Sequence, residues 1–150
     1  MIEAMLGLSK RNIEKAYNFQ NPENLFLIRQ NVELIQKVFS KEDNINRIYI
    51  NFCNPWPKEK HKKRRLTHTK QLENYKTFLS ENNAEIYFKT DDDELFEDSL
   101  KYLEESGFEI ITKTYDLHNE PIFEINIMTE HEEMFSEEGI KIKALMAKRK

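Results

Sequence analysis

The sequence predicts an α/β fold, in which helices are layered against a sheet. Three observations support this prediction: segments with strand and helix spacing alternate along the chain, two strand-like segments come last, and no internal repeat or linker interrupts the series. The expected strands are residues 25–28, 47–52, 84–89, 108–115 and 140–147, and the expected helices are residues 9–19, 32–39, 67–79 and 94–106, with a short helix opening at Thr129. The last two strands should form an antiparallel, hairpin-like finish.

Each segment is predicted from its own residues. The first helix has apolar side chains on one face and ends at Asn21-Pro22, while residues 25–28 form a continuous apolar run that suits a buried strand. Residues 47–52 are rich in β-branched and aromatic side chains, which favour a strand. Gly107 directly follows the fourth helix and is expected to cap it.

The composition is typical of one globular domain. Of 150 residues, 39% are hydrophobic and 33% are charged, which suits a core beneath a charged surface. Cys53 is the only cysteine, so no internal disulfide can form, in keeping with a reducing cytoplasm. No apolar run reaches the roughly 18 residues of a membrane span, and the first residues do not resemble a signal peptide. We therefore expect a single cytoplasmic domain over residues 1–150 that does not enter a membrane.

Charge is concentrated in two segments of opposite sign. Residues 58–70 contain seven cations and one acid, a net charge of +6, whereas residues 91–105 contain eight acids and one cation, a net charge of −7. The net charge of the whole chain is −4. A polyanion is therefore expected to bind at one place only, the basic segment.

The basic segment follows a predicted strand. Residues 54–57 read Asn-Pro-Trp-Pro, and six cations lie within the next eight residues. Ligands of open α/β sheets bind beyond the carboxyl ends of the strands, and two prolines restrict the backbone around Trp56. Cations beside an aromatic ring suit phosphate contacts and base stacking. The alternative is a solvated charged loop in which Trp56 fills the core.

The remaining candidates have strong structural alternatives. Asp91 follows the next predicted strand and should face the same edge of the sheet, although residues 91–93 also suit the cap of the following helix. His118 is interpreted as a loop histidine rather than a catalyst. Thr129 with Glu132 three residues later matches a capping box, and capping would explain both residues.

No metal site, phosphate loop or nucleophile is predicted. The four histidines have no partners at metal-ligand spacing, and the three glycines cannot form a glycine-rich nucleotide loop. Cys53 would need a base and an oxyanion donor, and the sequence identifies neither.

Four segments together resemble a known family. They read INFCNPWPKEKHKKRRLTH, EIYFKTDD, LHN and NIMTEHEEMFSEEG. In order and spacing they are similar to the bacterial tRNA (guanine(46)-N(7))-methyltransferases, over essentially the whole chain. The resemblance implies the class I S-adenosylmethionine-dependent methyltransferase fold, a Rossmann-like doubly wound sheet. It also implies tRNA as the partner and N7 of a variable-loop guanine as the methyl acceptor.

The resemblance further implies that the fold is incomplete at the N-terminus. Family members place a glycine-rich strand, loop and helix before the equivalent of Ile2-Glu3, and that segment wraps the methionine part of the cofactor. The S-adenosylmethionine site should then be incomplete, and little or no activity is expected from the chain in isolation. The gap in the sheet would also allow association with another chain.

Residue roles are carried over where the family motifs match. Glu3, Asn31 and Asn54 are expected to bind the cofactor, and Asn54 is also expected to be catalytic. The expected substrate and RNA contacts are Trp56, Lys58, Lys60, His61, Lys62, Lys63, Arg64, Arg65, Asp91, Thr129 and Glu132. Asn31 and Asn54 stand where the family usually has aspartate and so carry no charge, and Ile125 replaces a glycine.

The implied reaction needs no base, because guanine N7 already has an in-plane lone pair. Asp91 and Glu132 are the acids expected to bind the guanine edge and to stabilise the forming cation. Three hypotheses remain: a methyltransferase present as a fragment, a non-catalytic RNA-binding remnant, and an inert α/β domain. Binding of S-adenosylhomocysteine separates the first from the second, and salt-dependent tRNA binding separates the second from the third.

Overall fold

The computed structural model describes residues 2–20, 22–124 and 126–150, with side chains from residue 6 onward. The chain divides into two compact units, Met1–Asn31 and Val32–Lys150. The single domain expected over residues 1–150 stays a prediction. Among the described residues, no helix combines the length and the apolar character needed to cross a membrane. Within the same residues, no group of three or more His, Cys, Asp or Glu side chains is placed to hold a metal ion.

The first unit contains helix α1, Ile2–Ala16. It begins before the predicted residue 9, so Glu3 lies in a helix and not at the end of a strand. Good helix formers dominate this stretch, and their local preference decides the structure. The strand predicted at residues 25–28 is also wrong: the run forms no regular structure, and Phe26 exposes 84% of its surface. An apolar run becomes a strand only where a neighbouring strand pairs with it.

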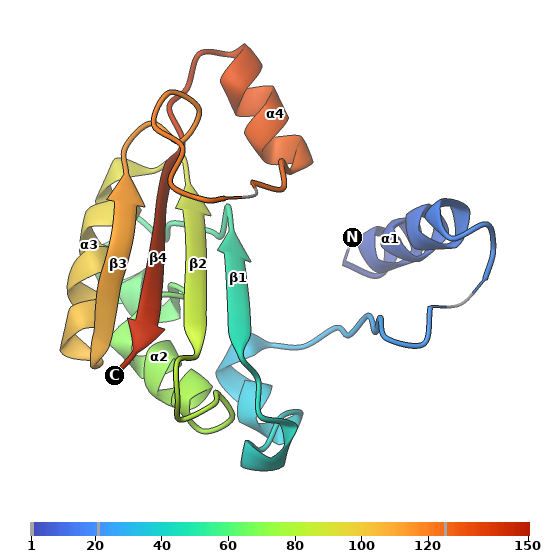
Figure 1. Ribbon diagram of the computed structural model, residues 1–150, viewed down its shortest axis with the longest axis horizontal. Helices are drawn as coiled ribbons and strands as arrows, with labels where there is room; N and C mark the ends of the chain where they lie inside the picture. The colour runs from blue at the N-terminus through green and yellow to red at the C-terminus, as the bar shows by residue number, and fades with distance from the viewer. Residues whose placement is uncertain (1, 21, 125) are drawn as a thin grey trace. The chain divides into compact units, whose positions relative to one another are not determined.

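The second unit is built on a sheet in the order β1-β2-β4-β3 (Figure 1). Its strands are β1 (Arg47–Asn51), β2 (Glu85–Thr90), β3 (Phe108–Thr114) and β4 (Lys143–Arg149). β1 and β2 run parallel, with Asn51 opposite Lys89. β4 is antiparallel to both β2 and β3, which confirms the antiparallel pairing expected of the last two strands.

Helices cover one face of this sheet and stand beyond one end of it (Figure 1). The α-helices of the unit are α2 (Thr69–Lys76), α3 (Asp93–Glu105) and α4 (Glu130–Glu137), and its 3-10 helices are η1 (Val32–Lys37), η2 (Lys41–Asp43) and η3 (Glu59–Arg64). Alternate residues of β2, Ile86 and Phe88, are fully buried against α2 and α3, where Leu72 and Phe96 meet them in one core. In Figure 1, α4 stands beyond the carboxyl ends of β1 and β2.

Candidate nucleic-acid interface

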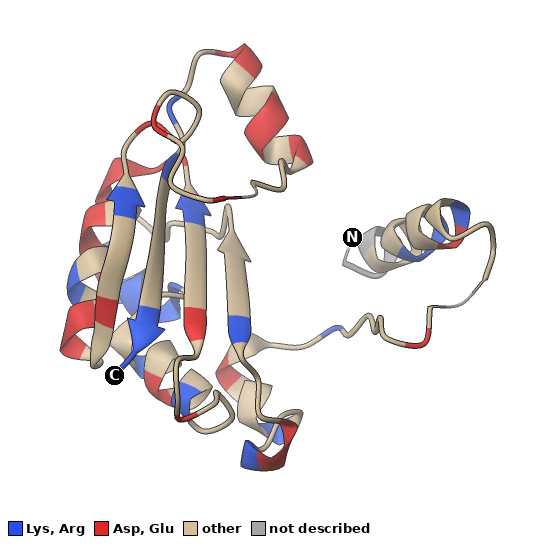
Figure 2. Ribbon diagram, viewed as in Figure 1, with Lys and Arg blue, Asp and Glu red and all other residues tan. Residues whose placement is uncertain are grey.

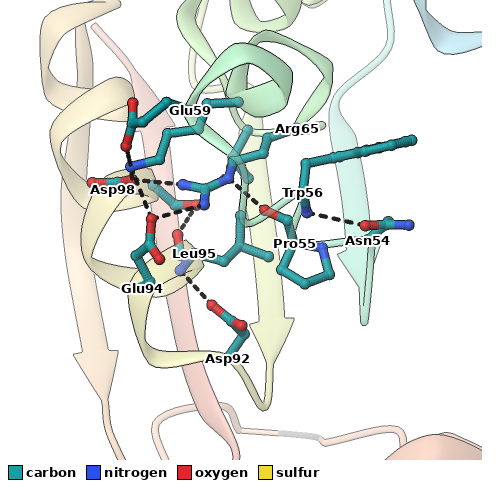
Figure 3. A network of polar contacts seen from close by, with 12 residues as sticks. Asn54, Pro55, Trp56, Glu59, Arg65, Asp92, Glu94, Leu95 and Asp98 are labelled. Carbon is teal, nitrogen blue, oxygen red and sulfur yellow. Dashed lines mark hydrogen bonds and ion pairs between the residues drawn. The ribbon is translucent and has the colours of Figure 1, made fainter.

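The basic loop, residues 54–65, begins where β1 ends. Phe52 continues the pairing with β2, because its N–H donates to the Lys89 carbonyl at 3.0 Å. The chain then turns: the Trp56 N–H donates to Asn54 Oδ1 at 3.0 Å, and the φ of Trp56 is +44° (Figure 3). Asn54 is thus an exposed turn residue at the carboxyl end of a parallel strand, where α/β sheets bind their ligands.

The 3-10 helix η3 sorts the side chains of the basic loop onto different faces. A 3-10 helix has three residues per turn, so side chains three positions apart lie above one another. Glu59, Lys62 and the C-cap residue Arg65 therefore share one face. His61 and Arg64 share another. The basic segment is thus partly helical, and the helix fixes the side on which each cation projects.

Arg65 points inward. It has no exposed surface, and its Nε donates to the Pro55 carbonyl at 2.6 Å (Figure 3). The other guanidinium nitrogens bind α3, at 2.6 Å to Asp98 and 3.2 Å to Glu94. The RNA contact predicted for Arg65 stays a prediction, and in this structure its donors are bonded inside the protein.

Lys62 binds the same two acids of α3. Its ammonium lies 2.8 Å from Glu94 and 3.0 Å from Asp98, and only 17% of its side chain is exposed. Hydrogen bonds from Lys62, and then from Arg65, hold the pKa of Glu94 below its usual value. Figure 2 shows that acidic residues recur along α3. The RNA contact predicted for Lys62 stays a prediction, although its ammonium is already paired with these acids.

Trp56 lies beside the second face of η3. The Arg64 guanidinium is 5.1 Å from the centre of the indole, and the His61 ring is 5.8 Å away. Trp56 is half-buried and belongs to neither described core cluster, so the interpretation in which it fills the core is wrong. The cations left exposed in the basic loop are Lys58, Lys60, Lys63 and Arg64.

Three aspartates follow β2, and they have different roles. Asp92 caps α3, because its carboxylate accepts from the Leu95 N–H at 2.6 Å. Asp93 is exposed in the first turn of α3 and pairs with Lys143 at 2.6 Å. Asp91 is partly exposed, and only its backbone carbonyl is bonded, accepting from Lys143 at 2.9 Å, among the contacts described. The capping alternative thus holds for Asp92, while the Asp91 carboxylate keeps its predicted place beyond the end of β2.

Thr129 and Glu132, at the start of α4, have different roles in the structure. Thr129 is the N-cap, and its hydroxyl accepts from the Glu132 N–H at 3.3 Å, as the capping interpretation predicts. The Glu132 carboxylate does not complete a capping box. It is fully buried, and it accepts from the Lys89 ammonium at 2.8 Å and from the Asn126 amide at 2.7 Å.

The buried Lys89 was not singled out by the sequence. Its side chain lies at the end of β2, where the ammonium also donates to the Ile127 carbonyl at 3.0 Å and to the Asn126 side chain. Lys89 therefore binds the segment before α4 to the end of the sheet. Two features of the sequence could have indicated the pair: Lys89 lies near the end of a predicted strand, and Glu132 belongs to a segment that matches the family. These features alone do not show that the two side chains meet.

The carboxyl end of the sheet collects most of the predicted residues of the second unit. Phe52, which follows β1, contacts the rings of His131 and Phe135 on α4 at 5.9 and 5.8 Å, and Lys89 joins β2 to the same helix. The strand ends that precede Trp56 and Asp91 thus meet the helix that Thr129 caps, whereas Glu132 is buried beneath this edge. A cavity of about 470 Å³ lies elsewhere, between α3 and β3.

The Lys89–Glu132 pair makes stability depend on pH. Burial alone would raise the pKa of Glu132, but the hydrogen bonds from Lys89 and Asn126 lower it below its usual value. The stabilisation is therefore complete above the unfolded-state pKa of about 4.3 and is lost as the pH falls through the lower folded-state value. We expect Glu132→Gln to lose less stability than the unchanged chain between pH 7 and pH 3 in urea unfolding. Equal losses would contradict this assignment.

The thiol of Cys53 does not add a nucleophile to this edge. Burial raises the pKa of the Cys53 thiol to about 11, so the group stays protonated at neutral pH.

The three residues expected at the cofactor are divided between the two units. Glu3 and Asn31 belong to the first unit, and the Glu3 side chain lies outside the described range, as does Ile125. Asn54 belongs to the second unit, where its side-chain carbonyl accepts from the Trp56 N–H. Asn54 offers a ribose hydroxyl or a sulfonium no charged acceptor, so the expected cofactor residue of the second unit does not by itself fit the methyl donor.

The fold and this edge define a class of protein. A Rossmann-like α/β sheet carries a cationic, aromatic loop at the carboxyl end of a parallel strand, which suits a polyanionic ligand. Residues 2–145 match the model of the family described as putative methyltransferase. The chain belongs to this family, which confirms the predicted fold class.

Curated proteins similar to this chain share one name, tRNA (guanine-N(7)-)-methyltransferase. The protein of Clostridium beijerinckii is 63% identical over 147 residues, which are 97% of this chain and 66% of that protein. The protein of Clostridium perfringens (strain 13) is 57% identical, over 98% of this chain and 67% of its own length. That of Acetivibrio thermocellus is 49% identical, over 99% and 68%. The chain thus spans about two thirds of the length of these relatives, and the predicted family resemblance is confirmed.

Proposed function

We propose that the chain is part of a tRNA guanine-N7 methyltransferase, which acts in the cytoplasm and transfers a methyl group from S-adenosylmethionine to N7 of a variable-loop guanine. The similar proteins are named for this activity. In the chain itself, the observation that carries the proposal is the basic loop beyond β1, with Arg64 stacked over Trp56.

The basic loop would bind the tRNA backbone. Exposed lysines and arginines contact phosphates, and a guanidinium or indole face stacks on a base. The loop offers both, because its exposed cations surround the half-buried Trp56. Acids dominate the neighbouring helix α3, so a phosphate chain would be kept to the side of the loop that faces away from that helix.

The guanine would lie toward the end of β2. Asp91 is partly exposed at this edge, and its described hydrogen bond uses the backbone carbonyl rather than the carboxylate. A carboxylate can accept from the N1–H and the amino group of guanine. Glu132 is buried against Lys89, so in this arrangement it would act by fixing the segment that ends in Thr129. Direct contact between Glu132 and guanine would require this ion pair to open.

Methyl transfer to N7 requires alignment rather than proton removal. The nitrogen has an in-plane lone pair, and S-adenosylmethionine supplies the methyl group from its sulfonium. Positive charge then develops on the purine, where a carboxylate such as Asp91 stabilises it. The loop and the segment before α4 would hold the base in line.

The salt dependence of tRNA binding tests the RNA-binding part of the proposal. If the exposed Lys58, Lys60, Lys63 and Arg64 all contact phosphates, the slope of log K against log salt should be about −3, and affinity should fall about 60-fold between 50 and 200 mM salt. Filter binding or fluorescence titration with tRNA measures this slope. Binding that does not change with salt would exclude the basic loop as a phosphate site and would favour an inert domain.

The second candidate is a non-catalytic RNA-binding remnant of the same fold. The neutral Asn54 side chain favours it, because its carbonyl is already bonded to the Trp56 N–H within the turn. Calorimetry with S-adenosylhomocysteine distinguishes the two functions. Binding of this compound supports the methyltransferase, while its failure to bind to a chain that still binds tRNA supports the remnant.

A further inference from the structure

The backbone of Trp56 has a conformation that bulky residues rarely adopt. Its φ of +44° lies in the left-handed region, where the side chain of an L-residue crowds its own backbone. Such a conformation persists only where surrounding contacts fix it, and it tends to occur at functional sites. The contacts that fix Trp56 therefore decide where the indole is presented.

Two contacts fix this turn, and one of them comes from Arg65. The Trp56 N–H donates to Asn54 Oδ1 within the turn, at 3.0 Å. The Pro55 carbonyl, which belongs to the peptide bond leading into Trp56, accepts from Arg65 Nε at 2.6 Å. Figure 3 shows the guanidinium between this carbonyl and the acids of α3, with the indole pointing away from it. Arg65 thus holds the peptide that sets the direction of Trp56.

Arg65 is itself held by a rigid part of the fold. Its side chain is fully buried, and Asp98 and Glu94 accept from its two terminal nitrogens. α3 is fixed in turn, because the Ser99 and Thr67 hydroxyls are bonded at 2.6 Å and the apolar side of the helix is in the core. The three bonds of Arg65 diverge to two elements. A planar fork can make them together, whereas a lysine ammonium is a single point of charge.

We infer that Arg65 is a positioning residue: its buried guanidinium ties the Asn54–Trp56 turn to α3 and so presents the indole and the Arg64 stack to RNA. The link to RNA rests on the function proposed above, while the effect on Trp56 does not. The two neighbouring arginines therefore have different roles. Arg64 is exposed and lies over the indole, whereas the buried Arg65 binds the backbone of the turn.

The sole tryptophan of the chain is Trp56, so its fluorescence reports on this turn directly. Arg65→Lys should raise the acrylamide quenching constant of Trp56 and lower its anisotropy, while circular dichroism shows a retained fold. tRNA affinity should fall about tenfold or more, because small misplacements of a binding group are costly, with the salt slope unchanged because Arg65 makes no phosphate contact.

Lys63→Ala is the matched control from the same loop. Lys63 is exposed and lies on another face of η3, so quenching should not change, while the salt slope should become less steep by about 0.7–0.9. If Arg65→Lys does not fold, Asp98→Asn replaces it. That variant removes the charge of the nearer of the two acidic partners of Arg65 and leaves the Glu94 and Pro55 bonds, so quenching should rise by a smaller amount.

The outcomes separate this inference from the proposed function. A folded Arg65→Lys protein with unchanged quenching and anisotropy overturns the positioning role, as does an unchanged Asp98→Asn protein where Arg65→Lys is unfolded. A loss of salt slope in Arg65→Lys equal to that of Lys63→Ala, with Trp56 unchanged, would show a phosphate contact instead. If the unchanged chain does not bind tRNA, the proposed function fails, and the Trp56 signals still decide the role of Arg65.

Discussion

Replacing Lys89 with methionine is expected to lower the free energy of unfolding by about 3–5 kcal/mol. Methionine preserves most of the volume of the lysine stem but removes the ammonium. The Glu132 carboxylate, which has no exposed surface, would then remain buried without its cation. Breaking a buried ion pair from one side is costly because the remaining charge is not solvated and would keep, of its described side-chain partners, only the Asn126 hydrogen bond and the His118 ring, whose Nε2 lies 3.5 Å away. Urea unfolding at pH 7, followed by circular dichroism, measures the change.

Lys143→Met provides the matched control. Both lysines are buried at ends of neighbouring strands, with 5% and 8% of their surfaces exposed. Their acidic partners differ, since the side chain of Asp93, the partner of Lys143, is 84% exposed. Water can solvate that carboxylate after the substitution, so the loss should be only about 1 kcal/mol. Equal losses in the two variants would mean that burial of the partner acid does not decide the cost.

A double variant tests whether charge is the cause. In Lys89→Met/Glu132→Gln the buried acid is replaced by a neutral amide, so the protein should be more stable than Lys89→Met alone. Lowering the pH should act in the same direction on Lys89→Met, because protonation of Glu132 removes the isolated charge. Were the double variant as unstable as the single one, lost packing rather than an isolated charge would be responsible.

Segments with clear local signals could be predicted from the sequence. The strand expected at residues 47–52 is observed at Arg47–Asn51, because its β-branched and aromatic residues suit a half-buried pleated surface. Gly107 ends α3 with a φ of +76°, as its position after the helix predicts. In these segments local preference and packing favour the same structure, so neither has to override the other.

The first 31 residues show where this agreement ends. The run at residues 25–28 is apolar enough for a strand, but strand formation depends on a paired neighbour, which the run itself does not contain. Likewise, the family resemblance assigned Glu3 to the cofactor site, whereas the helix-forming residues around it place it within α1. Such elements depend on contacts that are remote in sequence.

The position of the basic loop could be predicted from the sequence, but the directions of its side chains could not. The run from Lys58 to Arg65 indicated a cationic loop. Its sequence does not show that residues 59–64 form a 3-10 helix, in which side chains three positions apart share one face. That arrangement turns Lys62 and Arg65 toward the acids of α3, about thirty residues later. Lys89 was missed for a related reason, because its partner Glu132 lies 43 residues away. Long-range pairing of charges is a property of the folded chain.

Asn54→Asp is expected to raise the rate of methyl transfer about ten- to a hundredfold, since hydrogen bonds to charged groups contribute roughly 1.5–3 kcal/mol. Asn54 already accepts the Trp56 N–H through its side-chain oxygen, and aspartate has an oxygen at the same place. The turn should therefore keep its shape, so the substitution tests the charge alone. Single-turnover methylation of tRNA would be measured in a chimera that joins this chain to the third of the Clostridium beijerinckii relative that lies outside the matched region.

The control for added charge is Asn51→Asp in the same chimera. Asn51 is exposed at the end of β1, three residues before the turn, so the same charge is added at the same edge without entering the turn. Acceleration by Asn54→Asp alone would assign the effect to position 54. Equal acceleration by both variants would indicate a general field at the sheet edge, and an unchanged or lower rate in Asn54→Asp would remove the catalytic role from this position. Trp56 quenching in both variants shows whether the turn was preserved, because a displaced indole would lower the rate for reasons unrelated to charge.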